Sequence, residues 1–436
     1  MQLITNENIE AIRMPENLAL AMKVMQFRMK CQEMGCTYDY AHFAFGGSPF
    51  PVPDAVQDAL RSHSGDGEYL PAVGIEPLRK QIARFWRQHF DVEINPNRVV
   101  VMPGSKQAIY QTLALFEGPV MLQQPSWVGY LPIAQLLNKT IVELPTAADG
   151  GYRVTAAALD NVAKATAADQ SFLILNSPNN PTGAVYTEDE LAAIVEVCRK
   201  HNVLVISDEI YSLITYSGER YTSIAKLYPE GTFVATGISK YAGAGGYRLG
   251  FAILPDNCTE EQVLNFQKVG AATYTNASAP IQFAAVAAFG LDESMNRYID
   301  AQREIHRIMT TDLSRRFSEL SGVEATTPEG SFYFFADFEG LRSKLESHEI
   351  RTGMELEQVL YGHPHHIAMV AGESLLMPEE SLTFRVASVD YDGRAAMAAY
   401  LEEPPEDDSS ERAFVEAHAP RLLMGVERLR RFIDSL

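Results

Sequence analysis

Apolar residues in the middle of the chain gather in short runs that alternate with longer stretches of helical spacing. Seven mostly aliphatic runs are expected to be strands, namely 98–102, 120–124, 140–144, 172–175, 203–207, 233–236 and 249–254. Strands with so few polar residues are typical of parallel sheets that are covered on both faces. Helical patterns lie between several of them, as in 105–116 and 188–202. The pattern predicts an α/β fold around a mostly parallel sheet.

The last part of the chain has a different pattern. Residues 402–412 read EEPPEDDSSER, with two prolines and six acids. Such a segment has little to bury and predicts a solvated loop. Beyond it, apolar residues recur at helical spacing from Phe414 to Ile433. This spacing predicts one amphipathic helix at the end of the chain.

Composition and charge narrow the class of protein. The 436 residues correspond to roughly two or three domains. The net charge of −20 opposes binding to nucleic acid or to anionic lipid, although a local site can still bind a small anion. No signal-like apolar segment or membrane-spanning run of about 18 residues is present, so we expect a soluble, cytoplasmic protein. The four cysteines are too sparse for a disulfide scaffold and are expected to be buried or inert thiols: Cys31, Cys36, Cys198 and Cys258.

Ligands of α/β sheets bind beyond the carboxyl ends of the strands, so the residues there are the first candidates. The first run is followed by Gly104, Ser105 and Lys106 at the start of a helix. Free N–H groups and the helix dipole can hold a phosphate there, and a simple capped helix start is an equal alternative. Trp127 follows the second run and can either stack on a planar ligand or belong to the core.

Polar motifs follow the fourth, fifth and sixth runs. Residues 176–183, NSPNNPTG, form a rigid loop rich in amides. Asp208 begins the sequence Asp-Glu-Ile-Tyr directly after the fifth run. A carboxylate buried at this position is costly unless a partner pairs with it. The alternative is that Asp208 simply caps the start of a helix. Lys240 follows Ser239, and a lysine at such a strand end is a candidate for a lowered pKa and for Schiff-base chemistry.

Two further observations concern charge and glycine. Arg385 lies inside the apolar run 382–389, so it needs a buried partner, either a ligand carboxylate or an acid of the chain itself. Three glycines between Lys240 and Arg248 resemble half of a dinucleotide-binding fingerprint. They follow the lysine, however, and no acid stands about 20 residues later, which disfavours a nicotinamide dehydrogenase.

Together these motifs resemble the class I/II aminotransferases, pyridoxal-phosphate enzymes of the aspartate aminotransferase fold (fold type I). Asn-x-Pro-x-Asn-Pro-Thr-Gly stands at 176–183, Asp-Glu-x-Tyr at 208–211 and Ser-Lys at 239–240, with Gly246 six and Arg248 eight residues past the lysine. The match runs in the family's order from residue 46 to residue 385. The resemblance implies a large cofactor-binding domain over 51–290, with a seven-stranded sheet between helices. It also implies a smaller α/β domain that joins the N-terminal segment 1–50 to 291–436.

The resemblance also implies roles for residues at matching positions. Lys240 would hold pyridoxal 5'-phosphate as an internal aldimine and, once freed, act as the base that moves the proton from the substrate Cα. Asp208 would face the pyridine nitrogen and keep it protonated, since an ion pair at about 4 Å is worth about 4 kcal/mol at an effective dielectric near 20. Asn180 and Tyr211 would hydrogen-bond the phenolic oxygen, and Trp127 would stack on the ring.

The phosphate and the substrate would have their own sets of residues. The phosphate would rest on Ser105, Lys106, Ser239 and Arg248, together with a tyrosine of the neighbouring subunit that matches Tyr69. The resemblance therefore implies a homodimer with shared active sites. Arg385 would bind the substrate α-carboxylate through a bidentate fork, with Gly46 or Gly47 beside it and Asn180 nearby.

The chain departs from the family pattern at several places. The family's proline is displaced in the segment 46–50, so Gly46 and Gly47 are both retained as candidates. Position 237 is Gly, where many relatives have a hydroxyl, and 370–376 differs near the expected substrate entrance. Within that segment Glu373 would suit a basic substrate. The histidines at 363, 365 and 366 lack a metal-ligand spacing, so we expect a solvated loop and no metal site.

We therefore interpret the chain as a pyridoxal-phosphate-dependent aminotransferase that moves an amino group from an amino acid to a 2-oxo acid. The nearest alternative keeps the cofactor and changes the reaction to elimination, cyclisation or oxidation. A DNA-binding regulator of similar sequence would need an additional N-terminal domain, whereas only about 45 residues precede Gly46. The motifs do not identify the substrate side chain.

Overall fold

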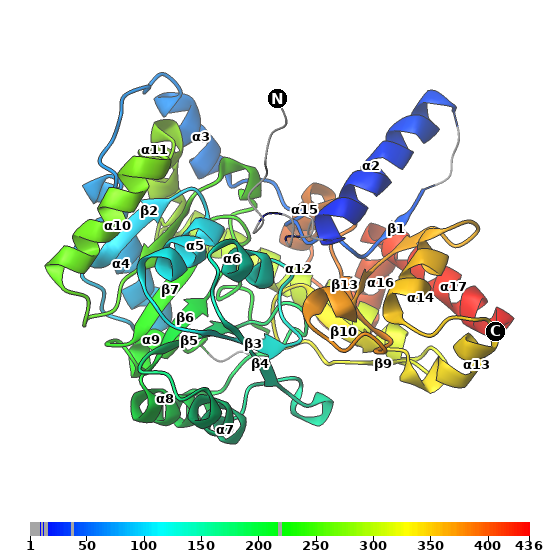
Figure 1. Ribbon diagram of the computed structural model, residues 1–436. Helices are drawn as coiled ribbons and strands as arrows, with labels where there is room; N and C mark the ends of the chain where they lie inside the picture. The colour runs from blue at the N-terminus through cyan, green and yellow to red at the C-terminus, as the bar shows by residue number, and fades with distance from the viewer. Residues whose placement is uncertain (1–8, 10–11, 13–15, 36–38, 217–219) are drawn as a thin grey trace, which may run out of the picture.

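The protein is described here by a computed structural model that covers residues 9, 12, 16–35, 39–216 and 220–436. Figure 1 shows two lobes, a larger one around a seven-stranded sheet and a smaller one that contains the C-terminus. The sheet has the order β2-β8-β7-β6-β5-β3-β4. Its strands are β2 (Val99–Met102), β8 (Gly250–Ile253), β7 (Thr232–Gly237), β6 (Val203–Asp208), β5 (Ser171–Asn176), β3 (Val120–Gln124) and β4 (Ile141–Pro145).

The seven predicted strands are confirmed, and so is the mostly parallel sheet. Only β8 runs against its neighbours, pairing antiparallel with both β2 and β7. Successive residues of β2 face opposite apolar clusters, with Val99 and Val101 on one side and Val100 and Met102 on the other. Because both faces are covered, side chains on either face must be apolar, which explains the continuous runs in the sequence.

Helices cover both faces of this sheet. The helices of the large lobe are α3 (Asp54–His63), α4 (Glu76–Phe90), α5 (Ser105–Leu115), α6 (Tyr130–Leu136), α7 (Ala156–Thr166), α8 (Glu188–His201), α9 (Ile224–Leu227), α10 (Glu260–Thr273) and α11 (Ala279–Ala288). α8 begins with a capping box between Thr187 and Glu190. The short connections place the start of α5, the end of β6 and the end of β7 at the same edge of the sheet.

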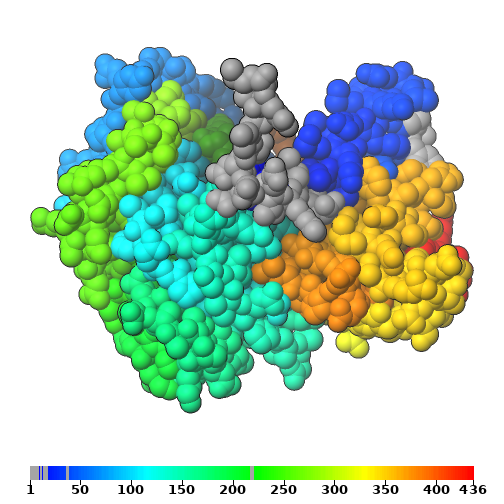
Figure 2. All heavy atoms as spheres, in the orientation of Figure 1, coloured from blue at the N-terminus to red at the C-terminus, as the bar shows by residue number. Residues whose placement is uncertain are grey.

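The smaller lobe combines residues from both parts of the chain. Its four-stranded sheet has the order β12 (Val370–Ala371), β13 (Thr383–Ala387), β10 (Tyr333–Asp337) and β9 (Glu324–Ala325). Its helices are α2 (Glu16–Glu33), α12 (Glu293–Ser318), α13 (Arg342–Ser347), α14 (Gly353–Tyr361), α15 (Gly393–Glu402), α16 (Asp408–His418) and α17 (Pro420–Ser435). β1 (Ala41–His42) pairs in parallel with β11 (Ile367–Ala368) and packs on α17, so the N-terminal segment joins the C-terminal part. Figure 2 shows α2 in dark blue on this lobe.

The prediction for the C-terminal segment is wrong in two respects. The solvated loop is limited to 403–407, because α15 extends to Glu402 and α16 begins at Asp408. Asp407 and Ser410 form a capping box, so the polar residues 408–412 make the first turn of a helix. The single terminal helix is instead a pair, since Pro420 cannot continue the ladder of α16 and begins α17.

The cysteines differ in state. Cys198 and Cys258 are buried free thiols, as expected. Cys31 is disulfide-bonded, which corrects the expectation of a thiol at that position, and Cys36 lies outside the described residues. Within the described ranges, none of the helices combines the length and the apolar character that a membrane span requires.

Gly425 of α17 lies against the N-terminal segment, and this contact generates a test. A Cβ at this position would lie 2.4 Å from Cζ of Phe43, a fully buried ring. We expect Gly425→Ala to lower the free energy of unfolding by about 1 kcal/mol, because overpacking outweighs the gain in helix propensity. Urea denaturation measures the change.

The matched control is Gly270→Ala in α10. There the added Cβ meets only the hydroxyl end of Tyr274 at 2.9 Å, which can move. This variant should be neutral or slightly stabilised. Equal stability of the two variants would contradict the packing argument.

Candidate functional site

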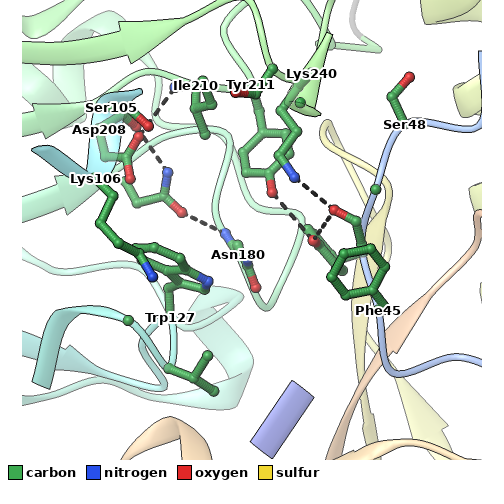
Figure 3. Close-up of a pocket in the computed structure, with 18 of the residues that line it drawn as sticks. Phe45, Ser48, Ser105, Lys106, Trp127, Asn180, Asp208, Ile210, Tyr211 and Lys240 are labelled. Carbon is green, nitrogen blue, oxygen red and sulfur yellow. Dashed lines mark hydrogen bonds between the residues drawn. The ribbon is translucent and has the colours of Figure 1, made fainter. Parts of the chain in front are cut away.

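A cavity of about 430 Å³ opens at the carboxyl ends of the central strands, between the two lobes. It brings together twelve of the thirteen site residues predicted from the sequence: Gly46, Gly47, Ser105, Lys106, Trp127, Asn180, Asp208, Tyr211, Ser239, Lys240, Arg248 and Arg385. Figure 3 shows Lys240, Tyr211, Asp208, Asn180 and Trp127 around one space. Tyr69 is outside it, with its side chain 88% exposed.

Asp208 ends β6 and is buried in the wall of the cavity. One of its carboxylate oxygens accepts a hydrogen bond from the Tyr130 hydroxyl at 2.7 Å, and the other accepts from the Ile210 N–H at 3.3 Å. The Asn176 amide donates to the Asp208 carbonyl at 2.9 Å and fixes the adjacent strand end. Burial raises the pKa of the Asp208 carboxyl to about 6, against the lowering effect of the Tyr130 hydrogen bond. This carboxylate is therefore a strong acceptor for a protonated group of a ligand.

Lys240 reaches the same cavity from the loop after β7. Its Nζ donates to the Gly46 carbonyl at 2.6 Å and lies 5.6 Å from the ring centre of Tyr211. Burial, followed by the positive charge of Arg385, lowers the pKa of the Lys240 amine to about 8. The neutral, nucleophilic form of this amine is therefore more accessible near physiological pH than that of an ordinary lysine.

The start of α5 and the Arg248 side chain form a positively charged corner of the cavity. Gly104 has φ +91°, and a Cβ there would lie 2.3 Å from Nη2 of Arg248, so only glycine allows this approach. Lys106 Nζ lies 4.9 Å from the ring centre of Trp127. Burial and the charge of Arg248 lower the pKa of the Lys106 amine. Helix N–H groups beside two cations favour an anion such as phosphate.

Arg385 of β13 is 1% exposed and faces the cavity. Its Nη1 donates to Oδ1 of Asn180 at 3.3 Å and its Nη2 to the Ala44 carbonyl, whereas its Nε has no partner in the described part of the chain. Among those residues no carboxylate forms an ion pair with it. The alternative of an internal acid is therefore not supported, and the guanidinium remains available for the carboxylate of a ligand.

Among the lining residues to which the sequence assigned no individual role, three contact the predicted site residues directly. Tyr130 holds Asp208, Asn176 donates to its carbonyl, and Tyr333 contacts both Tyr211 and Gly46. Tyr130 begins α6 three residues after Trp127, just beyond the end of β3, so the strand-end rule could have found it. Tyr333 begins β10 in the other lobe, and its sequence surroundings give no comparable signal.

Two departures in the sequence now have a structural setting. A Cβ on Gly237 would lie 2.6 Å from the Leu249 carbonyl oxygen, so the close strand contact excludes a side chain there. Glu373 does not line the cavity, because its carboxylate accepts from the Met354 N–H at 3.1 Å at the start of α14. The structure therefore gives no support to the suggestion that it faces a basic substrate.

The histidine segment 363–366 lies apart from the cavity. His366 is buried, with its ring centre 5.0 Å from that of Tyr40, so this end of the segment is packed and is not solvated as expected. No group of three or more His, Cys, Asp or Glu side chains in the described ranges is arranged to hold a metal ion.

The buried Asp208 carboxylate generates a test. Its folded-state pKa of about 6 exceeds the ordinary 3.8, so the unfolded chain binds fewer protons between these pH values. The loss of folding free energy caused by burying the charge grows between pH 4 and pH 6. Above pH 6 it reaches its full value of about 2 to 3 kcal/mol. We expect Asp208→Asn to raise the free energy of unfolding by about 2 kcal/mol at pH 8 and by much less at pH 4.

Urea denaturation of the protein without added ligand measures this difference at both pH values. Asp149→Asn, at an exposed position, is the control and should change stability little at either pH. A gain that is the same at pH 4 and pH 8 would refute the argument.

Comparisons with known proteins agree with this geometry. Residues 37–399 match the model of the family described as aminotransferase class I and II. An aspartate aminotransferase of Bacillus subtilis is 28% identical, covering 86% of this chain and 96% of that protein. An aromatic-amino-acid aminotransferase of Thermococcus litoralis is 31% identical, covering 69% of this chain and 77% of that protein.

A solved structure of a Thermus thermophilus aspartate aminotransferase with maleate superimposes with a TM-score of 0.80. It is 23% identical, and the match covers 99% of this chain and 100% of that one, which supports the fold. The family match covers most of the sequence, including every motif at the strand ends. The chain therefore belongs to the class I and II aminotransferases and is a transaminase of the aspartate aminotransferase fold.

Proposed function

We propose that this transaminase uses pyridoxal 5'-phosphate in the described cavity to move an amino group from an amino acid to a 2-oxo acid, with Lys240 as the residue that binds the cofactor covalently. The observation that carries the proposal is the convergence of Lys240, Asp208 and Arg385 on one cavity. The cofactor's aldehyde requires an amine, and its ring nitrogen requires a carboxylate. The carboxylate of an amino acid requires a guanidinium that has no other carboxylate partner.

The residues of the cavity fit the cofactor. The glycine-lined start of α5, together with Ser239 and Arg248, suits the phosphate. The buried Asp208 suits a protonated ring nitrogen, since a cation there would offset the cost that burial imposes on the carboxylate. Trp127 can cover the ring face, and Asn180 and Tyr211 can donate to its phenolic oxygen.

The bound cofactor supplies an electron sink that stabilises negative charge at the substrate Cα. The chain supplies the rest. Arg385 holds the α-carboxylate and thereby orients the Cα–H bond. The Lys240 amine, whose pKa is lowered by burial, would take the proton from the substrate Cα and deliver it to the cofactor carbon C4′, so that the amino nitrogen stays with the cofactor. Asp208, as the carboxylate, would face the ring nitrogen and favour its protonated form.

Replacement of Lys240 tests this assignment. We expect borohydride treatment of the cofactor-loaded protein to fix the cofactor on the peptide that contains Lys240, and to fix none in Lys240→Ala. Amino transfer to 2-oxoglutarate should fall by about a thousandfold or more, because the variant lacks both the attachment point and the base. Mass spectrometry and a keto-acid assay provide the two measurements.

Lys164→Ala changes an exposed lysine and should behave like the wild type. Release of ammonia without need for a 2-oxo acid would contradict transamination and favour a lyase or an oxidase. Cofactor fixed on another lysine would contradict the assignment of Lys240.

We further propose a homodimer in which Tyr69 of each subunit contacts the phosphate in the other. Its 88% exposure and its position outside the cavity of its own chain support this role. We expect Tyr69→Ala to weaken cofactor binding about tenfold, through loss of a hydrogen bond to a charged group.

Mixing the inactive Lys240→Ala variant with the Tyr69→Ala variant shows whether Tyr69 acts in the site of its own subunit or in the site of the partner subunit. Random exchange makes about half of the dimers mixed, and each mixed dimer has one complete site if Tyr69 acts across the interface. At limiting cofactor, activity should return to about a quarter of the wild-type value. No recovery after exchange, shown by native mass spectrometry, would refute the shared site.

A further inference from the structure

Tyr333 contacts two of the groups that the proposed function uses, Tyr211 and Arg385, and shares the Gly46 carbonyl with a third, Lys240, although that function gives it no role. It is the first residue of β10 and is 2% exposed. The Tyr211 hydroxyl donates to the Tyr333 hydroxyl at 3.2 Å. The Tyr333 hydroxyl in turn donates to the Gly46 carbonyl over a long 3.5 Å, and the same carbonyl accepts from Lys240 Nζ at 2.6 Å. One series of hydrogen bonds thus connects Tyr211 to Lys240.

The ring of Tyr333 supports the substrate side of the cavity. The guanidinium carbon of Arg385 lies 4.8 Å from its ring centre, within range of a cation–π contact. The two residues come from the paired strands β10 and β13. Tyr333 of β10 is opposite Ala387 of β13, and Arg385 is two residues before Ala387 on β13. With no carboxylate partner in the described residues, the guanidinium has this ring as its main planar contact.

The position of the Tyr333 hydroxyl also explains a glycine. A Cβ on Gly46 would lie 1.7 Å from the Tyr333 hydroxyl oxygen, so the tyrosine fills the space that any side chain at 46 would need. At Gly47 the nearest contact of an added Cβ is a Phe45 ring carbon at 3.2 Å, a milder conflict. The two glycines are therefore not equivalent, and Gly46 is the one that Tyr333 requires.

We propose that Tyr333 is a positioning residue of the aminotransferase reaction: its hydroxyl sets the Tyr211 hydroxyl and the Lys240 amine, and its ring sets the Arg385 guanidinium. This inference rests on the proposed function. According to this proposal, Tyr333 aligns Tyr211 and Lys240, which face the cofactor, with Arg385, which binds the substrate carboxylate. The two halves of the side chain have separable effects, so two substitutions test them.

Tyr333→Phe removes the hydroxyl and keeps the ring. Gly46 then accepts only from Lys240, which favours the charged amine and raises its pKa. In cofactor-free protein we expect acetylation of Lys240 at pH 7 to slow about threefold, measured by mass spectrometry of its peptide. In the loaded enzyme kcat should fall about tenfold, because Tyr211 loses its partner, while KM for the amino acid stays within about twofold.

Tyr333→Leu removes the ring as well. We expect KM for the amino acid to rise about tenfold above that of Tyr333→Phe, because Arg385 loses its planar contact. Tyr391→Phe is the control, since it also removes a buried hydroxyl, one that has no hydrogen-bond partner among the described residues and lies outside the cavity. It should leave Lys240 acetylation, kcat and KM unchanged.

The proposal is overturned if Tyr333→Phe matches Tyr391→Phe in both acetylation rate and kcat, or if Tyr333→Leu and Tyr333→Phe have the same KM. Borohydride should still fix the cofactor on Lys240 in Tyr333→Phe. Absence of fixation in the wild type would instead refute the proposed function. The acetylation of cofactor-free protein would then still decide whether Tyr333 acts on Lys240.

Discussion

Asp208, Lys240 and Arg385 are ionisable groups that the fold withdraws from water within one cavity. Each withdrawal costs several kcal/mol unless charges and dipoles of the protein replace the lost water. The replacement here is only partial. Asp208 has a tyrosine hydroxyl and a peptide N–H, and each cation has a peptide carbonyl. As a result, the pKa of Lys240 is lowered and the pKa of Asp208 is raised. A ligand that brings a positive charge to Asp208 and a negative charge to the cations would reduce this cost of burial.

The N-terminal segment is the part of the chain that serves both cations. Ala44 offers its carbonyl to Arg385 and Gly46 offers its own to Lys240, so two peptide groups two residues apart contact one charge from each lobe. The segment is anchored just before this point, where β1 pairs with β11 and Phe43 packs against Gly425. The union of the two chain ends in the smaller lobe is therefore a requirement of the site, since it fixes the carbonyls at the required distance.

The sequence predicts the part of this arrangement that local rules govern. Strands buried on both faces are continuous apolar runs, and residues that follow parallel strands converge, so twelve of the thirteen predicted positions line one cavity. Tyr333 escaped prediction because its contacts depend on how the second lobe packs on the first, a long-range property. The terminal helices were misread for the opposite reason: the acidic composition of 408–412 suggested solvent, while the local capping by Asp407 decides the structure.

Close packing also limits which residues can contact a phosphate. Position 237 is a glycine, one of the departures from the family pattern, and its neighbours Leu249 and Gly250 leave no space for a Cβ. A phosphate contact from that position would require the two antiparallel strands β7 and β8 to separate, at the cost of their backbone hydrogen bonds. Ser239 lies two residues further on and lines the cavity, so it can supply the hydroxyl without that cost. The glycine at 237 therefore allows the close packing of β7 and β8, and the serine at 239 can supply the hydroxyl that position 237 lacks.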